Sequence, residues 1–214
     1  MKTYLFDFDG TLVDSMPYYI KGVLKFLDDN KIKYDEDIIK IVTPLGFGGT
    51  ADYFIRQFGL KISESQIAEE IKNNMAFDYF YRIPAKNNVI SVLKTLKTRG
   101  ASLNVLTASP HVTLDACLKR IGIFDLFDNV WSCDDFSTTK VDSDIYKKAA
   151  EKLNVEIGDI LFLDDNYNAD KAAKSAGVQV CGVFDISSGN CVNDIKEVAD
   201  FYIYDFSELL KISY

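Results

Sequence analysis

The sequence predicts an α/β fold, a doubly wound, Rossmann-like core built on a parallel sheet, with a small α-helical cap domain inserted into it. Short apolar runs, such as residues 4–6 and 160–163, are typical of strands buried on both faces of a parallel sheet. Beyond Pro84 such runs alternate with helical periodicity, as in strands joined by crossover helices. Between the first run and Pro84, residues 16–82 show helical periodicity with almost no strand pattern.

The helical stretch has the pattern of several separate helices. We expect them at residues 18–27, 38–42, 50–58 and 63–80. Ser63 and Gln66 form the pattern of a capping box before the last helix, and the glycines at residues 46–49 predict a flexible loop before the third. A crossover between parallel strands needs only one helix. Four helices therefore favour a separate domain, and we divide the chain into an α/β core of residues 1–15 and 83–214 and a cap domain of residues 16–82.

The second half of the chain supplies the rest of the core. Apolar runs predict strands at residues 103–107, 129–132, 160–163, 178–183 and 201–204, the last at an edge of the sheet. Helical periodicity predicts helices at residues 89–97, 110–121, 142–153, 169–176 and 193–199. Gly100 and Gly177 stand where two of these helices are expected to stop, because glycine is the usual residue just past a helix end.

The composition limits the classes of partner. Of the 214 residues 48% are hydrophobic, which allows a packed core, and the formal charge of −8 disfavours nucleic acids and anionic membranes as partners. No apolar run is long enough to span a bilayer, and no signal peptide is recognisable, so we expect a cytoplasmic protein. The four cysteines are scattered, which predicts free buried thiols rather than a zinc site or disulfides. The sequence carries no signature of an oligomeric state.

Two carboxylates follow the first apolar run. Asp7 and Asp9 are separated by one residue, and alternation along an extended chain points both the same way. Like charges that close repel each other unless a cation lies between them. With no His or Cys nearby, the oxygen ligands favour a hard cation, above all Mg2+. A carboxylate at a strand end can also attack phosphorus, and one two residues later can pass a proton to the leaving group.

Polar residues follow two further predicted strands. Thr107, Ala108 and Ser109 lie where a strand meets a helix N-terminus, so a hydroxyl and free backbone N–H groups can bind an anion there. Ser109 can also serve as the cap of the helix that follows. Asp164 and Asp165 end a strand without polar residues, where adjacent carboxylates need a cation or a lysine to offset their charge. The carboxyl ends of parallel strands are where open α/β sheets bind their ligands.

Segment 7–15, Asp-Phe-Asp-Gly-Thr-Leu-Val-Asp-Ser, strongly resembles the first motif of the haloacid dehalogenase superfamily of phosphotransferases. The other three motifs of that superfamily match in order. They are a Thr or Ser at the position of Thr107, a Lys at the position of Lys140, and an acidic motif at Asp164 and Asp165. Four matches in order are far more specific than any one of them. A small helical cap after the first motif is common in this superfamily.

The resemblance implies a metal site and a nucleophile. Asp7 would attack phosphorus, and Asp9 would protonate the leaving oxygen and then deprotonate the attacking water. Asp7, Asp9 through its backbone carbonyl, and Asp165 would hold Mg2+. Either Asp164 or Asp170 would support the metal as a second acid, and the sequence leaves that choice open.

The resemblance also implies a phosphate pocket. Thr107, Ala108, Ser109 and Lys140 would bind the phosphoryl oxygens, and Thr107 and Lys140 would take part in catalysis. An ammonium group there would neutralise charge on the phosphoryl oxygens. A lysine at a loop tip is otherwise an ordinary surface charge. The two prolines that often follow this lysine in the superfamily are replaced within residues 141–143, which predicts a looser loop.

We therefore predict an enzyme, a Mg2+-dependent phosphatase that hydrolyses a small phosphorylated metabolite, a phosphate monoester, through an aspartyl-phosphate. A sugar-phosphate mutase of the β-phosphoglucomutase type is the alternative, because it would use the same site. A non-catalytic phosphometabolite-binding protein is the alternative of another class. The acid at Asp9 disfavours carbon–halogen cleavage, since the superfamily's dehalogenases lack it. Arg56, Arg82 and Lys86 are candidate contacts for a second anionic group of the substrate, although each is expected to be an ordinary surface charge.

Overall fold

The computed structural model describes residues 2–35 and 37–214. The chain divides into two compact units. The α/β unit comprises Met1–Asp14 and Pro84–Tyr214, and the helical unit comprises Ser15–Ile83. The α/β unit is therefore built from two stretches of chain, and the helical unit is inserted between them.

The α/β unit contains one sheet, whose six strands in the described residues have the order β3-β2-β1-β4-β5-β6. The strands are β1 (Thr3–Phe6), β2 (Ser102–Thr107), β3 (Asn129–Ser132), β4 (Ile160–Asp164), β5 (Gln179–Val183) and β6 (Phe201–Ile203). Each neighbouring pair is parallel. The order runs outward from β1 in both directions, which confirms the predicted doubly wound parallel sheet.

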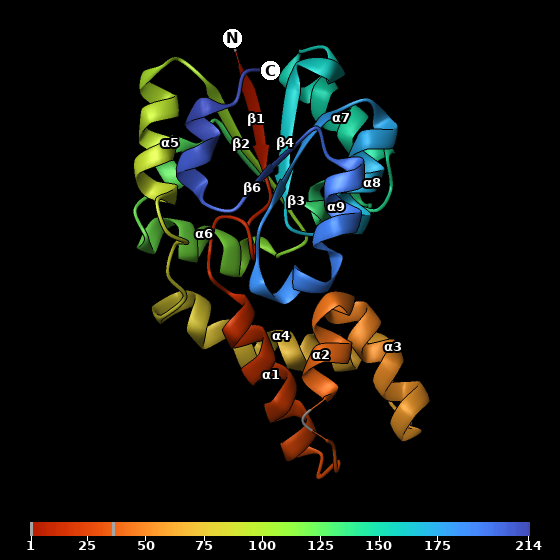
Figure 1. The fold of residues 1–214 in the computed structure, drawn as a ribbon. Coiled ribbons are helices and arrows are strands. Elements are labelled where there is room, and N and C mark those ends of the chain that lie inside the picture. Colours follow the sequence, from red (N-terminus) through yellow and green to blue (C-terminus); the bar gives the residue numbers. More distant parts are fainter. Residues whose placement is uncertain (1, 36) are drawn as a thin grey trace. The chain divides into compact units, whose positions relative to one another are not determined.

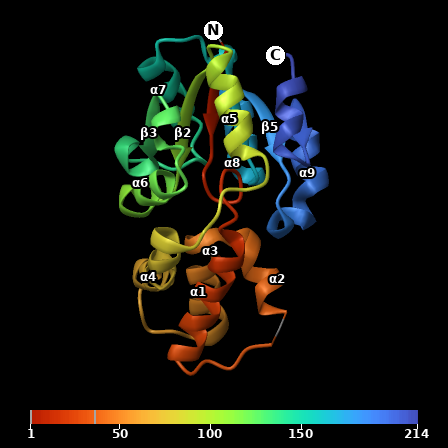
Figure 2. The ribbon, with the colours of Figure 1, turned by 90° about the vertical axis from the view of Figure 1, so that its left-hand side faces the viewer.

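Helices cover both faces of this sheet. They are α5 (Val89–Thr98), α6 (His111–Arg120), α7 (Asp144–Leu153), α8 (Tyr167–Ala176) and α9 (Val192–Val198). Shorter 3-10 segments are η2 (Phe124–Leu126), η3 (Cys133–Phe136), η4 (Ile157–Asp159), η5 (Ile186–Cys191) and η6 (Phe206–Lys211). Helix α5 and segment η6 lie on one side of the sheet, and α7 and α8 lie on the other (Figure 1). In the turned view α5 runs across the front of the sheet (Figure 2).

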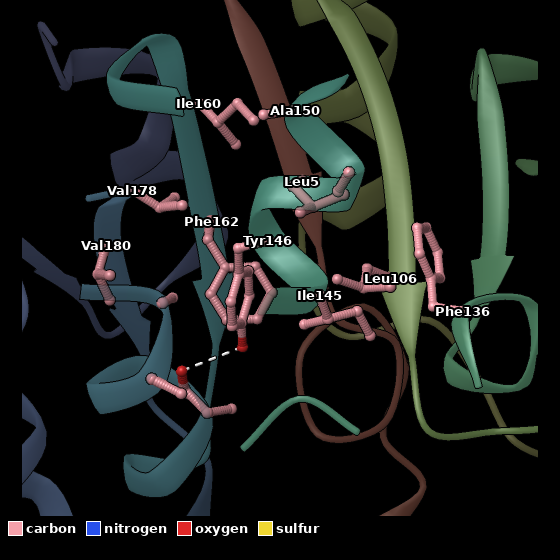
Figure 3. Packing of buried hydrophobic residues seen from close by; sticks show 14 of the residues in the cluster. Leu5, Leu106, Phe136, Ile145, Tyr146, Ala150, Ile160, Phe162, Val178 and Val180 are labelled. Atoms are coloured by element: carbon pink, nitrogen blue, oxygen red, sulfur yellow. Dashed lines mark hydrogen bonds between the residues drawn. The ribbon is translucent and has the colours of Figure 1, made fainter. Parts of the chain in front are cut away.

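The core between α7, α8 and the sheet is apolar and closely packed (Figure 3). Leu5 of β1 and Phe162 of β4 are fully buried there, as expected of central strands. The ring of Tyr146 packs edge-on against Phe162, with 5.0 Å between ring centroids. Ile145 on the same turn of α7 is also fully buried. This packing fixes the start of α7, which follows the loop that carries Lys140.

The helical unit has its own core. Its helices are α1 (Met16–Asp29), α2 (Ile38–Val42), α3 (Gly46–Phe58) and α4 (Glu64–Tyr81), with a short 3-10 segment η1 (Thr43–Leu45). Phe26 of α1 stacks on Phe54 of α3, with 5.7 Å between ring centroids. The predicted capping box at Ser63 and Gln66 is confirmed, since both of its hydrogen bonds are present. No described helix is long and apolar enough to cross a membrane.

The prediction of a loop at residues 46–49 is wrong, because these residues form the first turn of α3. Glycine is a poor helix former, so the intrinsic preference of this segment is against a helix. Packing overrides that preference. The ring of Tyr19 packs edge-on against Phe47 at 5.2 Å, and the Tyr19 hydroxyl lies 2.6 Å from that of Thr50. These contacts fasten the start of α3 onto α1.

Candidate active site

The register of the sheet brings three predicted site segments together at one edge, the one where the carboxyl ends of its strands lie. Phe6 of β1 pairs with Leu163 of β4, so the residues after these two positions, Asp7 and Asp164, lie level with each other. The Asp7 N–H donates to the carbonyl of Leu163 at 2.8 Å, which continues the ladder by one step. Thr107 ends β2, the other neighbour of β1. The residues predicted from separate strand ends therefore share one edge.

The chain turns sharply after Asp7. The N–H groups of Leu12 and Val13 both donate to the Phe8 carbonyl, at 2.9 and 3.0 Å. Gly10 within this turn has φ of +76°, a backbone conformation that residues other than glycine rarely adopt. A Cβ at Gly10 would also lie 2.6 Å from Oδ2 of Asp165. Both the backbone conformation and the close approach of Asp165 therefore require glycine here.

Three buried carboxyl groups meet at this edge. One oxygen from each of Asp7, Asp164 and Asp165 lies within 4.8 Å of the other two. Burial raises the pKa of Asp164 to about 7, although Lys140 acts against this shift. Burial, followed by the charges of Asp164 and Asp7, raises the pKa of Asp165 well above its usual value. Ionised carboxylates are unfavourable so close together, and an all-oxygen donor set fits a hard cation such as Mg2+.

Lys140 lies among these carboxylates, not at the surface. Its Nζ is 2.5 Å from Oδ1 of Asp7 and 2.6 Å from Oδ2 of Asp164, and its side chain is 12% exposed. Burial alone would lower the pKa of Lys140, but the charges of Asp164 and Asp7 outweigh it and hold the pKa well above its usual value. Lys140 therefore carries a fixed positive charge beside Asp7.

A tyrosine holds the loop of Lys140, which lacks the two prolines that often follow this lysine in the superfamily. The hydroxyl of Tyr146 lies 2.8 Å from the carbonyl oxygen of Lys140 and 3.1 Å from that of Ala169, the contact drawn as a dashed line in Figure 3. Because Tyr146 is fully buried in the core, this contact fastens the loop to a rigid position. Asp142 adds a local bond, since its Oδ1 accepts the N–H of Asp144 at the start of α7.

The hydroxyl of Ser109 contacts Asp9 and does not cap a helix. Its Oγ donates to Oδ2 of Asp9 at 2.5 Å, whereas α6 begins after Pro110 with no side-chain cap. The Ser109 N–H donates to Oγ1 of Thr107 at 3.1 Å, which uses an acceptor position of that hydroxyl and leaves its hydrogen to donate elsewhere. Ala108 connects the two. Ser109 thus orients Asp9, and Thr107 is a buried donor at the strand end.

Asp164 and Asp170, the two candidates for a supporting acid, have different surroundings. Asp164 belongs to the group of three carboxylates, and its Oδ1 accepts the N–H of Asn166 at 2.8 Å. Asp170, on α8, is fully buried, and neither of its oxygens has a hydrogen-bond partner among the described residues. Burial, followed by the charge of Asp164, raises the pKa of Asp170 well above its usual value. The geometry therefore favours Asp164 as the residue beside a cation.

The expectation that Lys86 is an ordinary surface charge is wrong. Its side chain is 20% exposed and its ammonium lies 2.9 Å from Oδ2 of Asp185, which is buried. Asp185 is not among the residues that the sequence motifs predict. A signal was present, since Asp185 follows the apolar strand β5 as Asp164 and Asp165 follow the apolar run of β4. An acid just past a buried strand points to the same edge of the sheet.

The chain resembles known proteins over most of its length. Residues 4–183 match the family described as haloacid dehalogenase-like hydrolase. Pyrophosphatase PpaX of Bacillus velezensis is 28% identical over 217 residues, which cover 98% of this chain and 94% of that protein. Many solved structures share the fold, and two examples follow.

One is a chain described as a "predicted phosphoglycolate phosphatase" from Haemophilus somnus, with a TM-score of 0.80 and 23% identity over 99% of this chain and 97% of that one. The other is CbbY from Rhodobacter sphaeroides in complex with phosphate, with a TM-score of 0.79 and 20% identity over 98% of this chain and 96% of that one. The matched family range includes every carboxylate of the acidic group and Lys140. The chain belongs to the haloacid dehalogenase-like hydrolases.

Proposed function

We propose that this hydrolase is a Mg2+-dependent phosphatase that cleaves the phosphate monoester of a small metabolite. The observation that carries the proposal is the buried group of Asp7, Asp164 and Asp165 with the ammonium of Lys140 inside hydrogen-bond distance of two of them. Phosphoryl transfer needs a nucleophile, a cation and fixed positive charge at one point. The pyrophosphatase name of the Bacillus velezensis relative supports a phosphorylated substrate.

The division of the chain into two units supports a proposal of two domains with different roles. We propose that residues 1–15 and 83–214 form the catalytic domain and residues 16–82 form an inserted cap domain. The unit boundary at Asp14 and Ser15 is one residue from the first proposed boundary. The unit boundary at Ile83 and Pro84 is one residue from the second.

The hydrogen bonds of the acidic group support a choice of cation ligands. Both oxygens of Asp164 already accept hydrogen bonds, one from Lys140 and one from the Asn166 N–H. Asp7 and Asp165 would therefore be the ligands, together with the backbone carbonyl of Asp9, and Asp164 would support them. When bound, Mg2+ supplies positive charge that neutralises the phosphoryl oxygens as the bond to the leaving group breaks.

The proposed reaction has two steps. In the first, a carboxylate oxygen of Asp7 attacks phosphorus, the bond to the ester oxygen breaks, and Asp9 donates a proton to that oxygen. In the second, Asp9 removes a proton from water, the water oxygen attacks phosphorus, and the bond to Asp7 breaks to release phosphate. The bond from Ser109 to Asp9 supports this double role, because it holds the carboxyl group in one orientation.

Fixed donors around phosphorus would lower the barrier. Lys140 remains charged at neutral pH and would neutralise the phosphoryl oxygens next to Asp7. Thr107 would donate its hydroxyl hydrogen, since its oxygen already accepts the Ser109 N–H. The backbone N–H groups of Ala108 and Ser109 are further members of the proposed pocket, although that of Ser109 already donates to Thr107. These groups need little reorganisation during the reaction, which is the advantage of a preorganised site.

The direct test is phosphate release from a panel of phosphorylated metabolites with Mg2+ and with a chelator. We expect release from at least one monoester, and loss of release when the chelator is present. The panel includes pyrophosphate and a hexose 1-phosphate. Cleavage of pyrophosphate alone would contradict a monoesterase, and conversion of the hexose 1-phosphate to the 6-phosphate without free phosphate would establish a mutase.

The nucleophile assignment is tested by Asp7→Asn. The amide is nearly isosteric with the carboxylate but is a far weaker nucleophile, so we expect turnover to fall below detection. Asp9→Asn should lose nearly all turnover, because the leaving oxygen then receives no proton. Substantial phosphate release by purified Asp7→Asn would show that another group attacks phosphorus.

A further inference from the structure

Lys86 lies near the start of the second stretch of the α/β unit, and its ammonium group has three hydrogen-bond partners. Nζ donates to the carbonyl oxygen of Gly10 at 2.6 Å, to that of Phe184 at 2.7 Å and to Oδ2 of Asp185 at 2.9 Å. An ammonium group has three hydrogens. All of them are committed within the α/β unit, so none remains to bind an anionic group of a substrate.

Backbone bonds join the segment of Lys86 to the turn that follows Asp9. The N–H of Asp14 donates to the carbonyl of Pro84, and the N–H of Lys86 donates to the carbonyl of Leu12, both at 3.0 Å. An antiparallel bridge lies between these two bonds. The end of the turn is therefore fastened by the backbone, and the side chain of Lys86 extends this attachment to Gly10.

Gly10 is the point where this attachment meets the acidic group. The carbonyl that Lys86 holds belongs to the residue directly after Asp9. The Gly10 Cα lies so close to Asp165 that a Cβ would be 2.6 to 2.8 Å from its carboxylate atoms. Next to it, Thr11 donates its hydroxyl to Oδ1 of Asp165 at 3.2 Å. A shift of the Gly10 peptide would therefore move Asp9 and change the surroundings of Asp165.

The acid that pairs with Lys86 is itself fixed. Both the N–H and the hydroxyl of Ser187 donate to Oδ1 of Asp185, at 2.9 and 2.6 Å. The side chain of Asp185 is only 5% exposed. A buried carboxylate with one oxygen held by Ser187 presents the other to Lys86 in a defined direction, so the loop after β5 serves as an anchor.

We propose that Lys86 is a positioning residue for phosphoryl transfer, which ties the Gly10 peptide to the loop after β5 and so keeps Asp9 and Asp165 in place. This proposal rests on the proposed function above. Lys86 touches no reacting atom; it acts through the turn. Since small displacements of catalytic groups are costly, loss of the tie should lower the rate of the chemical step more than it affects substrate binding.

The test is Lys86→Met, which keeps the length of the side chain and removes the ammonium group. With Mg2+ and p-nitrophenyl phosphate we expect kcat to fall by about 10-fold to 100-fold and KM to change by less than about threefold. Hydrogen exchange at the amides of residues 10–14 should become faster. Lys174→Met is the matched control, because Lys174 pairs with Asp200 at the surface, and it should change neither kcat nor this exchange.

The double variant Lys86→Met/Asp185→Asn distinguishes the positioning role of Lys86 from a purely structural one. The single variant leaves the buried carboxylate of Asp185 without a countercharge, which alone destabilises the fold. The double variant removes that charge, so we expect its melting temperature to return toward that of the wild type while kcat stays low. Recovery of kcat in the double variant would overturn the proposal. If the single variant does not fold, the double variant carries the same measurements.

The two proposals fail in different ways. If the wild-type protein cleaves no phosphate ester, the proposed function fails, but hydrogen exchange at residues 10–14 still reports whether Lys86 holds the turn. Unchanged exchange in both variants would overturn the positioning role. In an active protein, an unchanged kcat, or a raised KM with kcat unchanged, would also overturn it, because a raised KM alone is the behaviour of a substrate contact.

Discussion

Two groups of charges in the α/β unit each place one basic residue beside two aspartates, but they differ in burial and in the basic residue. In the first, Lys140 is 12% exposed and lies between the buried carboxyl groups of Asp7 and Asp164. In the second, His111 at the start of α6 is 42% exposed and lies 2.9 Å from Asp115 and 2.9 Å from Asp135.

The distances in the two groups are similar, so they differ in burial and in charge, which is fixed for Lys140 and depends on pH for His111. Water screens a half-exposed pair, whose contribution to stability is typically below about 1 kcal/mol. A buried pair loses its hydration, and removing one partner leaves an uncompensated charge that costs about 3 to 5 kcal/mol. Geometry alone therefore does not rank these contacts. The consequences of substitution should follow the degree of burial, from the acidic group to the histidine.

Among the substitutions that compare these two groups, the largest effect is expected for Lys140→Met. We expect kcat to fall by about 100-fold to 1,000-fold, because a fixed positive charge next to the nucleophile is lost. Two buried carboxylates also lose their partner, so unfolding in urea should show a loss of about 3 kcal/mol.

Lys147→Met is the matched control for this substitution. Lys147 lies on α7, seven residues after Lys140, and its ammonium is 2.8 Å from Oδ1 of Asp144, but its side chain is 56% exposed. We expect no measurable change in the urea unfolding midpoint and unaltered kcat, because the pair is screened by water. Equal effects of the two substitutions would contradict the conclusion that burial decides.

An intermediate effect is expected for Mg2+ on thermal stability, with a defined pH dependence. Burial raises the pKa of Asp164 from 3.8 to about 7. Without a cation, the stability that this raised pKa confers is fully present below 3.8 and is lost as pH rises through about 7. Because a bound cation would lie beside Asp164 and favour its ionised form, the increase in melting temperature on adding Mg2+ should grow as pH rises through about 7.

The control for the Mg2+ effect is Asp165→Asn at matched ionic strength. This variant removes a proposed ligand and should lose most of the increase in melting temperature. An increase that is independent of pH, or that persists in Asp165→Asn, would place the Mg2+ site elsewhere.

The smallest effect is expected for His111→Gln. Bonds to Asp115 and then to Asp135 raise the pKa of His111 above 6.5. The stability from this shift is present below about pH 6.5 and is lost as pH rises through the raised pKa. We expect the free energy of unfolding, measured in urea, to be higher for the wild type than for His111→Gln by less than about 1 kcal/mol at pH 5.5. At pH 9 we expect no difference. A difference that persists at the higher pH would show that packing, not charge, is involved.

Much of the candidate site could be predicted from local patterns. Asp7, Thr107 and Asp164 each stand at the end of an apolar run, and such runs are reliable signs of buried parallel strands. Lys140 is predicted only from the resemblance of its segment to a family motif, because a lysine in a loop is by itself uninformative. Residues 46–49 are helical where the sequence predicts a loop, because a glycine-rich segment has no local sign of the aromatic packing that makes it helical.

The role of Lys86 cannot be predicted from local sequence patterns. Its partners Gly10 and Asp185 are 76 and 99 residues away in the chain, and no pattern around position 86 reports them. The choice between Asp164 and Asp170 has the same character, because both are acids near one strand end and only their surroundings separate them.

By itself, the sequence determined the alternation of strands and helices, the inserted helical stretch and the strand ends that carry the acids. Apolar periodicity is a local property, so it can be read directly along the chain. Only the tertiary structure decided which charges are buried, which ammonium group touches which carboxylate, and which glycine must remain free of a side chain. Those facts depend on the dielectric surroundings and on contacts between distant segments, and neither is encoded within any short stretch of residues.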